Sequence, residues 1–276
     1  GYALLFRAHF ALIRNPLFTS YGLNTSALFG FINQLLKIKK DENPEYFACA
    51  FDSKGKTFRH EMYEEYKANR PPMPDELQQQ LPHLWEILDA MNIPVLKKDG
   101  VEADDIIGTL AVRAQDDGLD TYIVSGDKDF MQLINENIFL YAPGTKKSPN
   151  PVIYDSKRVE EKWGVPPEKI IDLLGLMGDS SDNVPGVSGV GEKTAVKLIK
   201  KYGSLDGALE NADQVSNKRA RTGLQEGAEN ARLSQDLVTI MLDVEIDSSL
   251  DDFISAKMNN SCLLYTSDAA DEWWRG

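Results

Sequence analysis

Cysteine and histidine are scarce in this sequence, and their scarcity excludes several kinds of site. The 276 residues include only two cysteines, Cys49 and Cys262, and three histidines. The cysteines lie far apart and lack the paired spacing of a zinc site, so neither a disulfide framework nor a structural zinc centre is expected. No Ser-His-Asp or Cys-His grouping indicates a covalent mechanism.

Long apolar runs are also missing. No stretch approaches the ~20 apolar residues that span a bilayer, and the N-terminus lacks the layout of a signal peptide. Hydrophobic residues make up 42% of the chain and charged residues 26%, which is typical of a globular protein of one large or two modest domains. We therefore expect a soluble, cytoplasmic protein with no membrane partner.

Basic residues are fewer than acidic ones. There are 30 lysines and arginines against 43 aspartates and glutamates, so the formal net charge is −13. Taken alone, this balance argues against nucleic acid as a partner, because phosphate backbones attract lysine and arginine. The distribution of the charges along the chain matters more than their sum, however.

The first half of the chain alternates predicted strands with predicted helices. This alternation predicts an α/β fold with a mainly parallel central sheet and helices on both faces. Such sheets carry their chemistry at the carboxyl ends of the strands. The expected strands are 46–51, 93–97, 121–124 and 138–141, and the expected helices are 24–40, 75–91 and 103–115, with a short helix up to residue 133.

A change of character near residue 155 indicates a domain boundary. Residues 142–151 are rich in glycine, proline and polar residues, as loops are. After them the strand pattern fades, and 155–243 has the pattern of short helices interrupted by glycine and proline. We therefore expect an α/β region over 1–154 and a helical region over 155–253.

Four acidic clusters stand where predicted strands end or turns begin. A single acidic residue at a helix start most often only caps the helix or complements its dipole. Four clusters at one edge of a sheet would repel one another unless cations neutralised them, so they predict bound metal. The candidate ligands are Asp52, Glu102, Asp104, Asp105, Asp127, Asp129, Asp179 and Asp182.

The chemistry of these ligands points to a particular class of reaction. Hard oxygen donors favour Mg²⁺ or Mn²⁺ over zinc or copper, and no segment has the EF-hand pattern of a Ca²⁺ loop. Eight carboxylates exceed the needs of one octahedral ion, so two or more ions are expected. Two ions about 3.5–4 Å apart can activate water and stabilise the departing oxygen of a phosphodiester. The predicted chemistry is phosphodiester hydrolysis.

A glycine-rich turn at 183–195 (NVPGVSGVGEKTA) leads into a lysine-rich helix. Glycines permit tight backbone conformations, and the positive end of a helix attracts phosphate. A plain turn between two helices is the alternative interpretation. The length of the pattern and the preceding GDSSDN favour binding of a phosphate backbone without base reading. The candidate contacts are Gly186, Gly189, Gly191, Lys193 and Lys197, with Lys200 and Lys201 adding charge.

Together these motifs resemble the 5′ nuclease domain found at the N-terminus of bacterial DNA polymerase I, which is related to the flap endonucleases. The resemblance runs from Gly1 to about Phe253. It rests on five motifs that occur in the family's order: FDSKGKTFRHEMYEEYKANRPPMP, GVEADDIIGTLA, SGDKDFMQL, LMGDSSDNVPGVSGVGEKTA and LSQDLVTI.

The resemblance implies a PIN-like fold and assigns the eight carboxylates to a metal site. It implies that 183–201, including Thr194, is a helix–hairpin–helix-type element that binds duplex DNA and holds a K⁺ ion. It makes 58–74 an arch over the active site, where Tyr66 would stack on a base and Lys67 and Arg70 would stabilise charge on the scissile phosphate. Arg7 and Arg59 would be further phosphate contacts.

Both ends of the chain depart from the family pattern. The family begins with a strand ending in Asp-Gly whose aspartate is a metal ligand, and no such strand precedes Tyr2. We expect a fragment boundary there, with lower stability and activity than a chain that has the strand. Residues 259–276 have no counterpart in the family and resemble translated adaptor sequence, so Cys262, Trp273 and Trp274 are given no function.

The resemblance predicts a metal-dependent, structure-specific 5′ nuclease that acts on DNA flaps, nicks and single-strand/double-strand junctions in replication and repair. It would be a monomer or the N-terminal part of a polymerase chain. Two alternatives remain open: a nuclease of related fold that acts on RNA, and a junction-binding module without catalysis. The first explains the carboxylates but not the arch and glycine turn, and retention of the candidate ligands counts against the second.

Overall fold

The computed structural model describes residues 1–145 and 148–256, which form two compact units built from interleaved segments. Unit 1 contains Gly1–Ser53, Pro72–Lys98 and the described residues after Val244. Unit 2 contains Lys54–Pro71 and Asp99–Val244. The unassigned tail 259–276, with Cys262, Trp273 and Trp274, lies outside the described residues. None of the described helices is long and apolar enough to cross a membrane.

Unit 1 is a small helical body around one pair of strands. Strands β1 and β2 are parallel, with Cys49 opposite Val95. Apolar side chains of the helices and of β1 form its core, in which Phe31, Phe51 and Leu84 are almost fully buried. Its elements are α1 (Tyr2–Leu12), α2 (Ser26–Glu42), β1 (Cys49–Ala50), α4 (Asp75–Gln78), α5 (Leu81–Ala90), β2 (Val95–Leu96) and the 3-10 turn η4 (Leu250–Phe253).

The single helix expected over 75–91 is divided into α4 and α5. Pro82 lies in the first turn of α5, where its missing N–H is tolerated, whereas in a continuous helix it would remove an internal hydrogen bond. Gln80, between the two helices, is fully buried. Its Oε1 accepts hydrogen bonds from the N–H groups of Ala27 and Leu28 at 3.1 and 3.2 Å, so it caps the start of α2.

Unit 2 contains a three-stranded sheet in the order β3-β4-β5. Strands β3 (Thr121–Val124) and β4 (Ile138–Ala142) are parallel, as expected, and helix α6 (Ala103–Asp116) packs against them. Strand β5 (Val152–Tyr154), which was not predicted, pairs antiparallel with β4. The 3-10 turn η1 (Asp129–Leu133) follows β3. The mainly parallel α/β character is confirmed, although the described strands form two small sheets rather than one.

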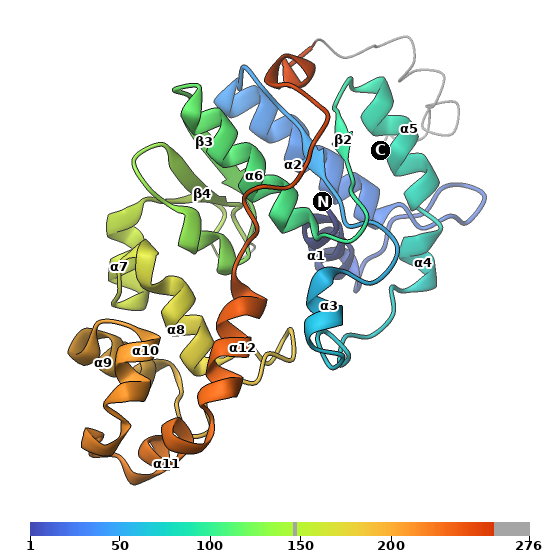
Figure 1. The fold of residues 1–276 in the computed structure, drawn as a ribbon. Coiled ribbons are helices and arrows are strands. Elements are labelled where there is room, and N and C mark those ends of the chain that lie inside the picture. The colour runs from blue at the N-terminus through green and yellow to red at the C-terminus, as the bar shows by residue number, and fades with distance from the viewer. Residues whose placement is uncertain (146–147, 257–276) are drawn as a thin grey trace. The chain divides into compact units, whose positions relative to one another are not determined.

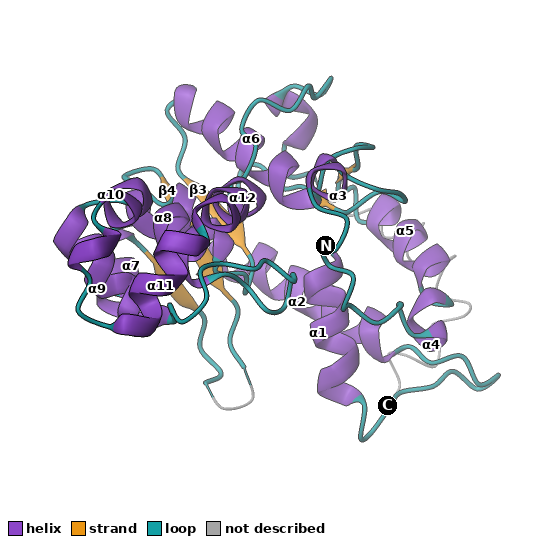
Figure 2. Cartoon of the chain, turned by 60° about the horizontal axis from the view of Figure 1, so that its bottom comes forward, coloured by secondary structure: helices purple, strands orange, loops and turns teal. Residues whose placement is uncertain are grey.

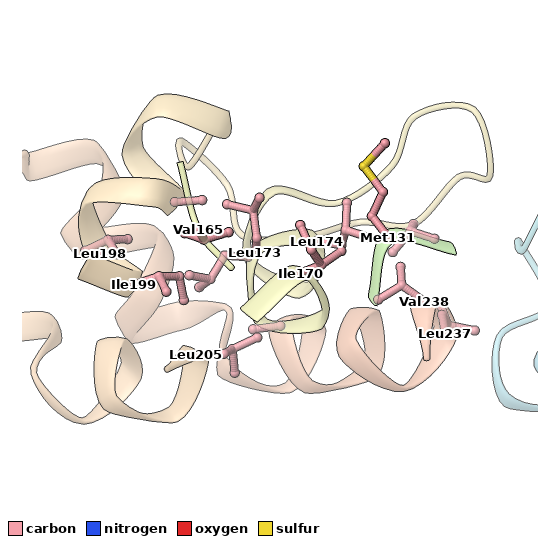
Figure 3. Packing of buried hydrophobic residues seen from close by; sticks show 14 of the residues in the cluster. Met131, Val165, Ile170, Leu173, Leu174, Leu198, Ile199, Leu205, Leu237 and Val238 are labelled. Atoms are coloured by element: carbon pink, nitrogen blue, oxygen red, sulfur yellow. The ribbon is translucent and has the colours of Figure 1, made fainter. Parts of the chain in front are cut away.

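The rest of unit 2 is helical, as expected, and Figure 2 shows its purple helices beside the orange strands. Leu173 and Leu174 of α8 (Ile170–Met177) lie in one apolar cluster (Figure 3). The same cluster contains Leu198 of α9 (Glu192–Tyr202), Leu205 of α10 (Leu205–Glu210) and Leu237 of α12 (Ala228–Val238). The helices are α3 (Phe58–Met62), α7 (Ser156–Trp163), α8 (Ile170–Met177), α9 (Glu192–Tyr202), α10 (Leu205–Glu210), α11 (Lys218–Glu226) and α12 (Ala228–Val238), with 3-10 turns η2 (Pro167–Lys169) and η3 (Ala212–Gln214) (Figure 1).

Candidate functional site

The candidate site in unit 2 begins with the turn that follows α8. The N–H of Asp179 donates to the carbonyl of Val184 at 3.0 Å, and the reverse bond is 2.7 Å long. Ser181 donates from its N–H to Asp179 Oδ1 at 2.8 Å. Asn183 has a φ of 57°, a left-handed conformation that asparagine tolerates better than most residues. This local network holds the two acidic side chains of GDSSDN in a fixed turn.

The segment after α3 lies against this turn. The expected arch, 58–74, is helical only from Phe58 to Met62 and continues as a series of turns. The Lys67 N–H donates to the Asp182 carbonyl at 2.9 Å, and the Asn69 side chain donates to the Ser180 carbonyl at 2.7 Å. Lys67 has a φ of 57°, which is unfavourable for a residue with a long side chain. These main-chain contacts place the arch residues next to the acidic turn.

Glu102, at the start of α6, is held by two arch residues. Lys67 Nζ lies 2.5 Å from Glu102 Oε1 and 3.6 Å from Asp182 Oδ2, and the Tyr66 hydroxyl donates to Glu102 Oε2 at 3.1 Å. Burial, reinforced by the negative charge of Glu102, raises the pKa of Tyr66. Tyr66 is 4% exposed, so in this conformation its ring packs in the protein core.

Two further cations pair with the acidic turn. Arg70 forms an ion pair with Asp182, and Lys128 Nζ lies 2.7 Å from Asp179 Oδ2. Burial alone would raise the pKa of Asp179, but hydrogen bonds from Lys128 and Ser181 outweigh it and hold that pKa below its usual value. The sequence analysis did not predict a role for Lys128. Its position between two predicted metal ligands in SGDKD could have indicated that it pairs with nearby carboxylates.

Asp129 has a carboxylate oxygen with no partner in the described part of the chain. Its Oδ1 is buried and accepts no hydrogen bond. Burial, together with repulsion from Asp127, raises the pKa of Asp129 well above its usual value. A buried, unpaired carboxylate oxygen beside other carboxylates is costly unless a cation neutralises it. Of the features in this site, the unpaired Asp129 Oδ1 is the one that best fits a bound metal ion.

Asp105 and Arg59 have different surroundings from those expected of a metal ligand and a phosphate contact. Asp105 is fully buried and Arg59 is 2% exposed. The Arg59 guanidinium makes a two-pronged ion pair with Asp105, at 2.7 and 2.8 Å. Burial would lower the pKa of Arg59, but the bonds to Asp105 reverse this and raise it. The structure therefore places both charges inside the protein, against each other.

The predicted ligands are only partly brought together. Among residues 1–145 and 148–256, no three acidic, histidine or cysteine side chains stand close enough to hold a metal ion. Asp104 is half-buried at the start of α6, and Asp127 is half-buried after β3. Asp52 and Arg7 belong to unit 1, where Asp52 is exposed one residue past the buried Phe51 and Arg7 is half-buried on α1.

The glycine turn leads directly into α9. Gly186 and Gly189 have φ values of +60° and +78°, which glycine adopts readily, whereas Gly191 is the extended N-cap of α9. The Gly186 N–H donates internally to Ser234 Oγ at 2.8 Å, so it is not available to a phosphate. The N-cap of α9 makes no side-chain hydrogen bond. The candidates Lys193 and Lys197 are exposed on this helix, and Thr194 between them is half-buried.

A shallow pocket adjoins the glycine turn. Its lining includes Ser188 of the turn and Lys218, Arg219 and Thr222 of α11. A Cβ atom on Gly223 would lie 1.9 Å from the Ser188 carbonyl oxygen, so only glycine lets α11 approach the turn this closely. Sequence reasoning missed these residues of α11, because nothing near them in the chain marks their proximity to the turn.

The fold and this acidic site define a nuclease-type α/β domain followed by a helical domain, and two family models cover both parts. The 5′-3′ exonuclease N-terminal resolvase-like domain matches residues 1–164, and the 5′-3′ exonuclease C-terminal SAM fold matches residues 165–261. The chain belongs to the 5′-3′ exonuclease family. The expected resemblance is thereby confirmed.

Curated relatives agree with this assignment. A 5′-3′ exonuclease of Aquifex aeolicus is 40% identical over 91% of this chain and 83% of its own length. DNA polymerase I of Bacillus subtilis is 45% identical and that of Caldicellulosiruptor bescii is 42% identical, over 91% and 95% of this chain. The chain spans only 28% and 31% of those two polymerases.

Solved structures share the fold at low sequence identity. T5 5′-exonuclease with bound zinc has a TM-score of 0.73 at 20% identity, covering 98% of this chain and 96% of its own. The catalytic core of Rad2 in complex with DNA has a TM-score of 0.58 at 17% identity, covering 89% of this chain and 79% of that one. These likenesses establish the architecture.

Proposed function

We propose that this chain hydrolyses DNA phosphodiesters near 5′ ends, flaps and nicks, using two or more Mg²⁺ or Mn²⁺ ions. The observation that carries the proposal is the unpaired, buried Asp129 Oδ1, in a side chain whose pKa is raised by burial and by the charges of Asp127, Asp179 and Asp182. Membership in the 5′-3′ exonuclease family supports it. The T5 flap endonuclease of similar fold was crystallised with DNA and metal ions.

The carboxylates of unit 2 would hold the ions. When bound, such ions supply an activated water and neutralise the departing oxygen of the phosphodiester. The proposed ligands in this unit are Glu102, Asp104, Asp127, Asp129, Asp179 and Asp182. The family resemblance separately predicts that Asp52, which belongs to unit 1, is a metal ligand. Asp105, whose oxygens are already engaged by Arg59, is not part of this set.

Lys67 and Arg70 would bind the reacting phosphate. In the described conformation they serve as counter-ions of Glu102 and Asp182. Both residues belong to the segment that contacts the acidic turn GDSSDN. Both side chains remain partly exposed to solvent, 17% for Lys67 and 51% for Arg70. Once the carboxylates have another counter-charge, these cations are free to bind phosphate oxygens and stabilise negative charge in the transition state. A stacking role for Tyr66 requires its ring to leave the core.

The turn 183–201 would bind duplex backbone. The uncapped start of α9 presents N–H groups to an anion, and Lys193 and Lys197 add exposed positive charge. Such contacts fix the position of the duplex without reading its sequence. A K⁺ ion at this turn is proposed from the family resemblance. Replacing K⁺ by Na⁺ at constant ionic strength would test it through duplex affinity.

One assay tests the activity. The chain is incubated with a 5′-labelled flap DNA or a matched RNA hairpin, with Mg²⁺ or EDTA. We expect Mg²⁺-dependent cleavage of the DNA that leaves a 5′-phosphate and is abolished by Asp129→Ala, while Lys157→Gln, an exposed control, cleaves normally. Binding of DNA without cleavage would favour a junction-binding module, and preferential RNA cleavage would favour an RNA nuclease.

We also propose that the chain works in the bacterial cytoplasm, in replication and repair. Its bacterial DNA polymerase I relatives support this, and they support an N-terminal position in a longer polymerase chain. Sedimentation of the protein with and without flap DNA would test the expectation that it acts as a monomer.

A further inference from the structure

The buried pair of Arg59 and Asp105 links three parts of unit 2. Arg59 belongs to α3, and Asp105 to the first turn of α6. The Arg59 Nε donates to the Leu237 carbonyl at 2.8 Å and Nη2 donates to the Thr239 carbonyl at 2.7 Å. The pair thus joins the base of the arch segment, the start of α6 and the chain leaving α12.

The hydrogen-bonding capacity of Asp105 is fully used. Its two oxygens accept from both terminal nitrogens of Arg59, from the Glu102 N–H at 2.9 Å and from the Met241 N–H at 2.9 Å. An ionised carboxylate offers about four lone-pair sites. All four have donors, so Asp105 has no oxygen lone pair to offer a cation in this arrangement.

Arg59 is equally committed. It makes two bonds to a carboxylate and two to carbonyls, its Nη1 lies 3.4 Å from Glu102 Oε2, and its guanidinium carbon lies 4.5 Å from the Phe58 ring centroid. A guanidinium that is 2% exposed cannot reach a phosphate in solution. Breaking it free would leave a buried, unpaired carboxylate, which is strongly unfavourable.

The Arg59–Asp105 pair positions the backbone of residues in the proposed metal and phosphate site. The Asp105 carboxylate fixes the backbone N–H of Glu102, and Glu102 in turn binds Lys67 and Tyr66. On the Arg59 side, its carbonyl accepts the Tyr63 N–H at 2.9 Å, at the point where the arch turns begin. Both ends of the pair therefore set backbone that carries proposed catalytic groups.

We infer that Arg59 and Asp105 form a positioning pair that holds Glu102 and the base of the arch segment, and that neither residue contacts a metal ion or a phosphate. The inference rests on the proposed function of the surrounding carboxylates. It separates one of the eight acidic residues from the ligand set and one arginine from the DNA contacts.

Mn²⁺ titration by calorimetry, without DNA, tests the claim that neither residue contacts a metal ion. The variants are Arg59→Gln, Asp105→Asn and the double variant, with Asp129→Asn as the ligand reference. A positioning pair predicts that both single variants weaken Mn²⁺ binding about tenfold with the number of ions unchanged, and that the double variant is no worse than either. Loss of an ion in Asp105→Asn together with unchanged or tighter binding in Arg59→Gln would overturn it.

The salt dependence of duplex binding, measured in EDTA, tests the claim that Arg59 does not contact a phosphate. Lys193→Gln should reduce the slope of log affinity against log salt by about 0.9, as expected for one lost phosphate contact. Arg59→Gln should leave that slope unchanged. A reduction by Arg59→Gln equal to that of Lys193→Gln would overturn the inference.

Thermal melting gives a readout that needs neither metal nor DNA. Each single variant should lower the melting temperature by about 10 °C, since each leaves one buried charge unpaired, and the double variant should be less destabilised than the sum. Additive losses would contradict the pairing. If Arg59→Gln fails to fold, Arg59→Lys takes its place, because lysine keeps the positive charge but lacks the two-pronged geometry of the guanidinium group. If the unaltered chain binds no Mn²⁺, the proposed function fails, and the slope and melting results still decide the inference.

Discussion

Lys128 Nζ lies 2.7 Å from Asp179 Oδ2 and so ties the turn after β3 to the turn after α8. Burial would lower the pKa of Lys128, but its bond to Asp179 and the nearby acidic residues raise it. Lys128 is therefore firmly charged, and it neutralises carboxylates that we propose to be metal ligands. A lysine and a divalent cation would compete for the same negative charge.

Lys128→Gln should consequently bind Mn²⁺ more tightly. Removing a competing cation worth about 1 kcal/mol raises the affinity roughly fivefold. The metal-free variant should melt about 2–4 °C lower, because the repulsion between the carboxylates is no longer offset. Calorimetry and melting curves measure the two effects. The matched control is Lys157→Gln, which removes an exposed pair with Glu161 and should change neither. Weaker Mn²⁺ binding by Lys128→Gln would contradict the competition.

Lys67→Ala should slow cleavage much more than it weakens binding. Its proposed partner is the reacting phosphate, so its loss should lower kcat by about 100-fold, as for other groups that stabilise transition-state charge. Affinity for flap DNA measured in Ca²⁺ should change less than threefold. Single-turnover cleavage and a binding titration give the comparison. Equal losses in both would assign Lys67 to substrate binding alone.

Gly223→Ala should separate α11 from the glycine turn. The added Cβ would fall 1.9 Å from the Ser188 carbonyl oxygen, and displacing backbone at a packed contact costs about 1–3 kcal/mol or more. Thermal unfolding should detect this, with a matching loss of duplex affinity. Gly191→Ala is the control, since nothing lies within 4 Å of its added Cβ and its φ of −95° suits alanine. Similar melting of the two variants would argue against the close approach.

His60 should make stability depend on pH. The Thr57 N–H donates to His60 Nδ1 at 3.1 Å, so this nitrogen must be unprotonated. Burial lowers the pKa of His60, and Lys67 and Lys56 lower it further against the opposing effect of Glu102. The pKa of His60 in the folded protein therefore lies below the unfolded value of about 6.5. The stability that neutral His60 contributes to the folded state is fully present above that pH and is lost as the pH falls below it. Melting between pH 8 and 5 should show the loss.

The His60→Gln variant provides the comparison. It should lack the part of the pH dependence that begins near the unfolded pKa of histidine, while acid unfolding at lower pH remains. NMR titration of His60 itself gives the sign directly. A pKa above that of a free histidine would reverse the expected trend.

Local pattern was enough to predict much of the fold. The alternation around β3 and α6 gave strands and helices close to their observed bounds, and it placed Asp127 and Asp129 at a strand end. Family motifs marked out the glycine turn and the segment 58–74, whose role as an arch stays a prediction. These features depend on residues that are neighbours in the chain, which is why sequence periodicity captures them.

The remaining features depend on partners far away in the sequence. Arg59 has the same motif context whether it faces a phosphate or Asp105, and its bonds join it to residues 46 and 178 positions away. Strand β5 is short and pairs only with β4, so its three residues carry too little pattern to stand out. The approach of α11 to Ser188 is likewise a tertiary contact.

The Gln80 cap of α2 has a consequence for synthesis of the chain. Its amide oxygen receives the N–H of Ala27 from a distance of 53 residues along the sequence. At a translation rate of ~5–20 residues per second, α2 emerges several seconds before its cap exists. During that interval the Ser26 N–H can already bond to Asn24 Oδ1, but the N–H groups of Ala27 and Leu28 have only water or a chaperone until Gln80 has followed them out of the ribosome.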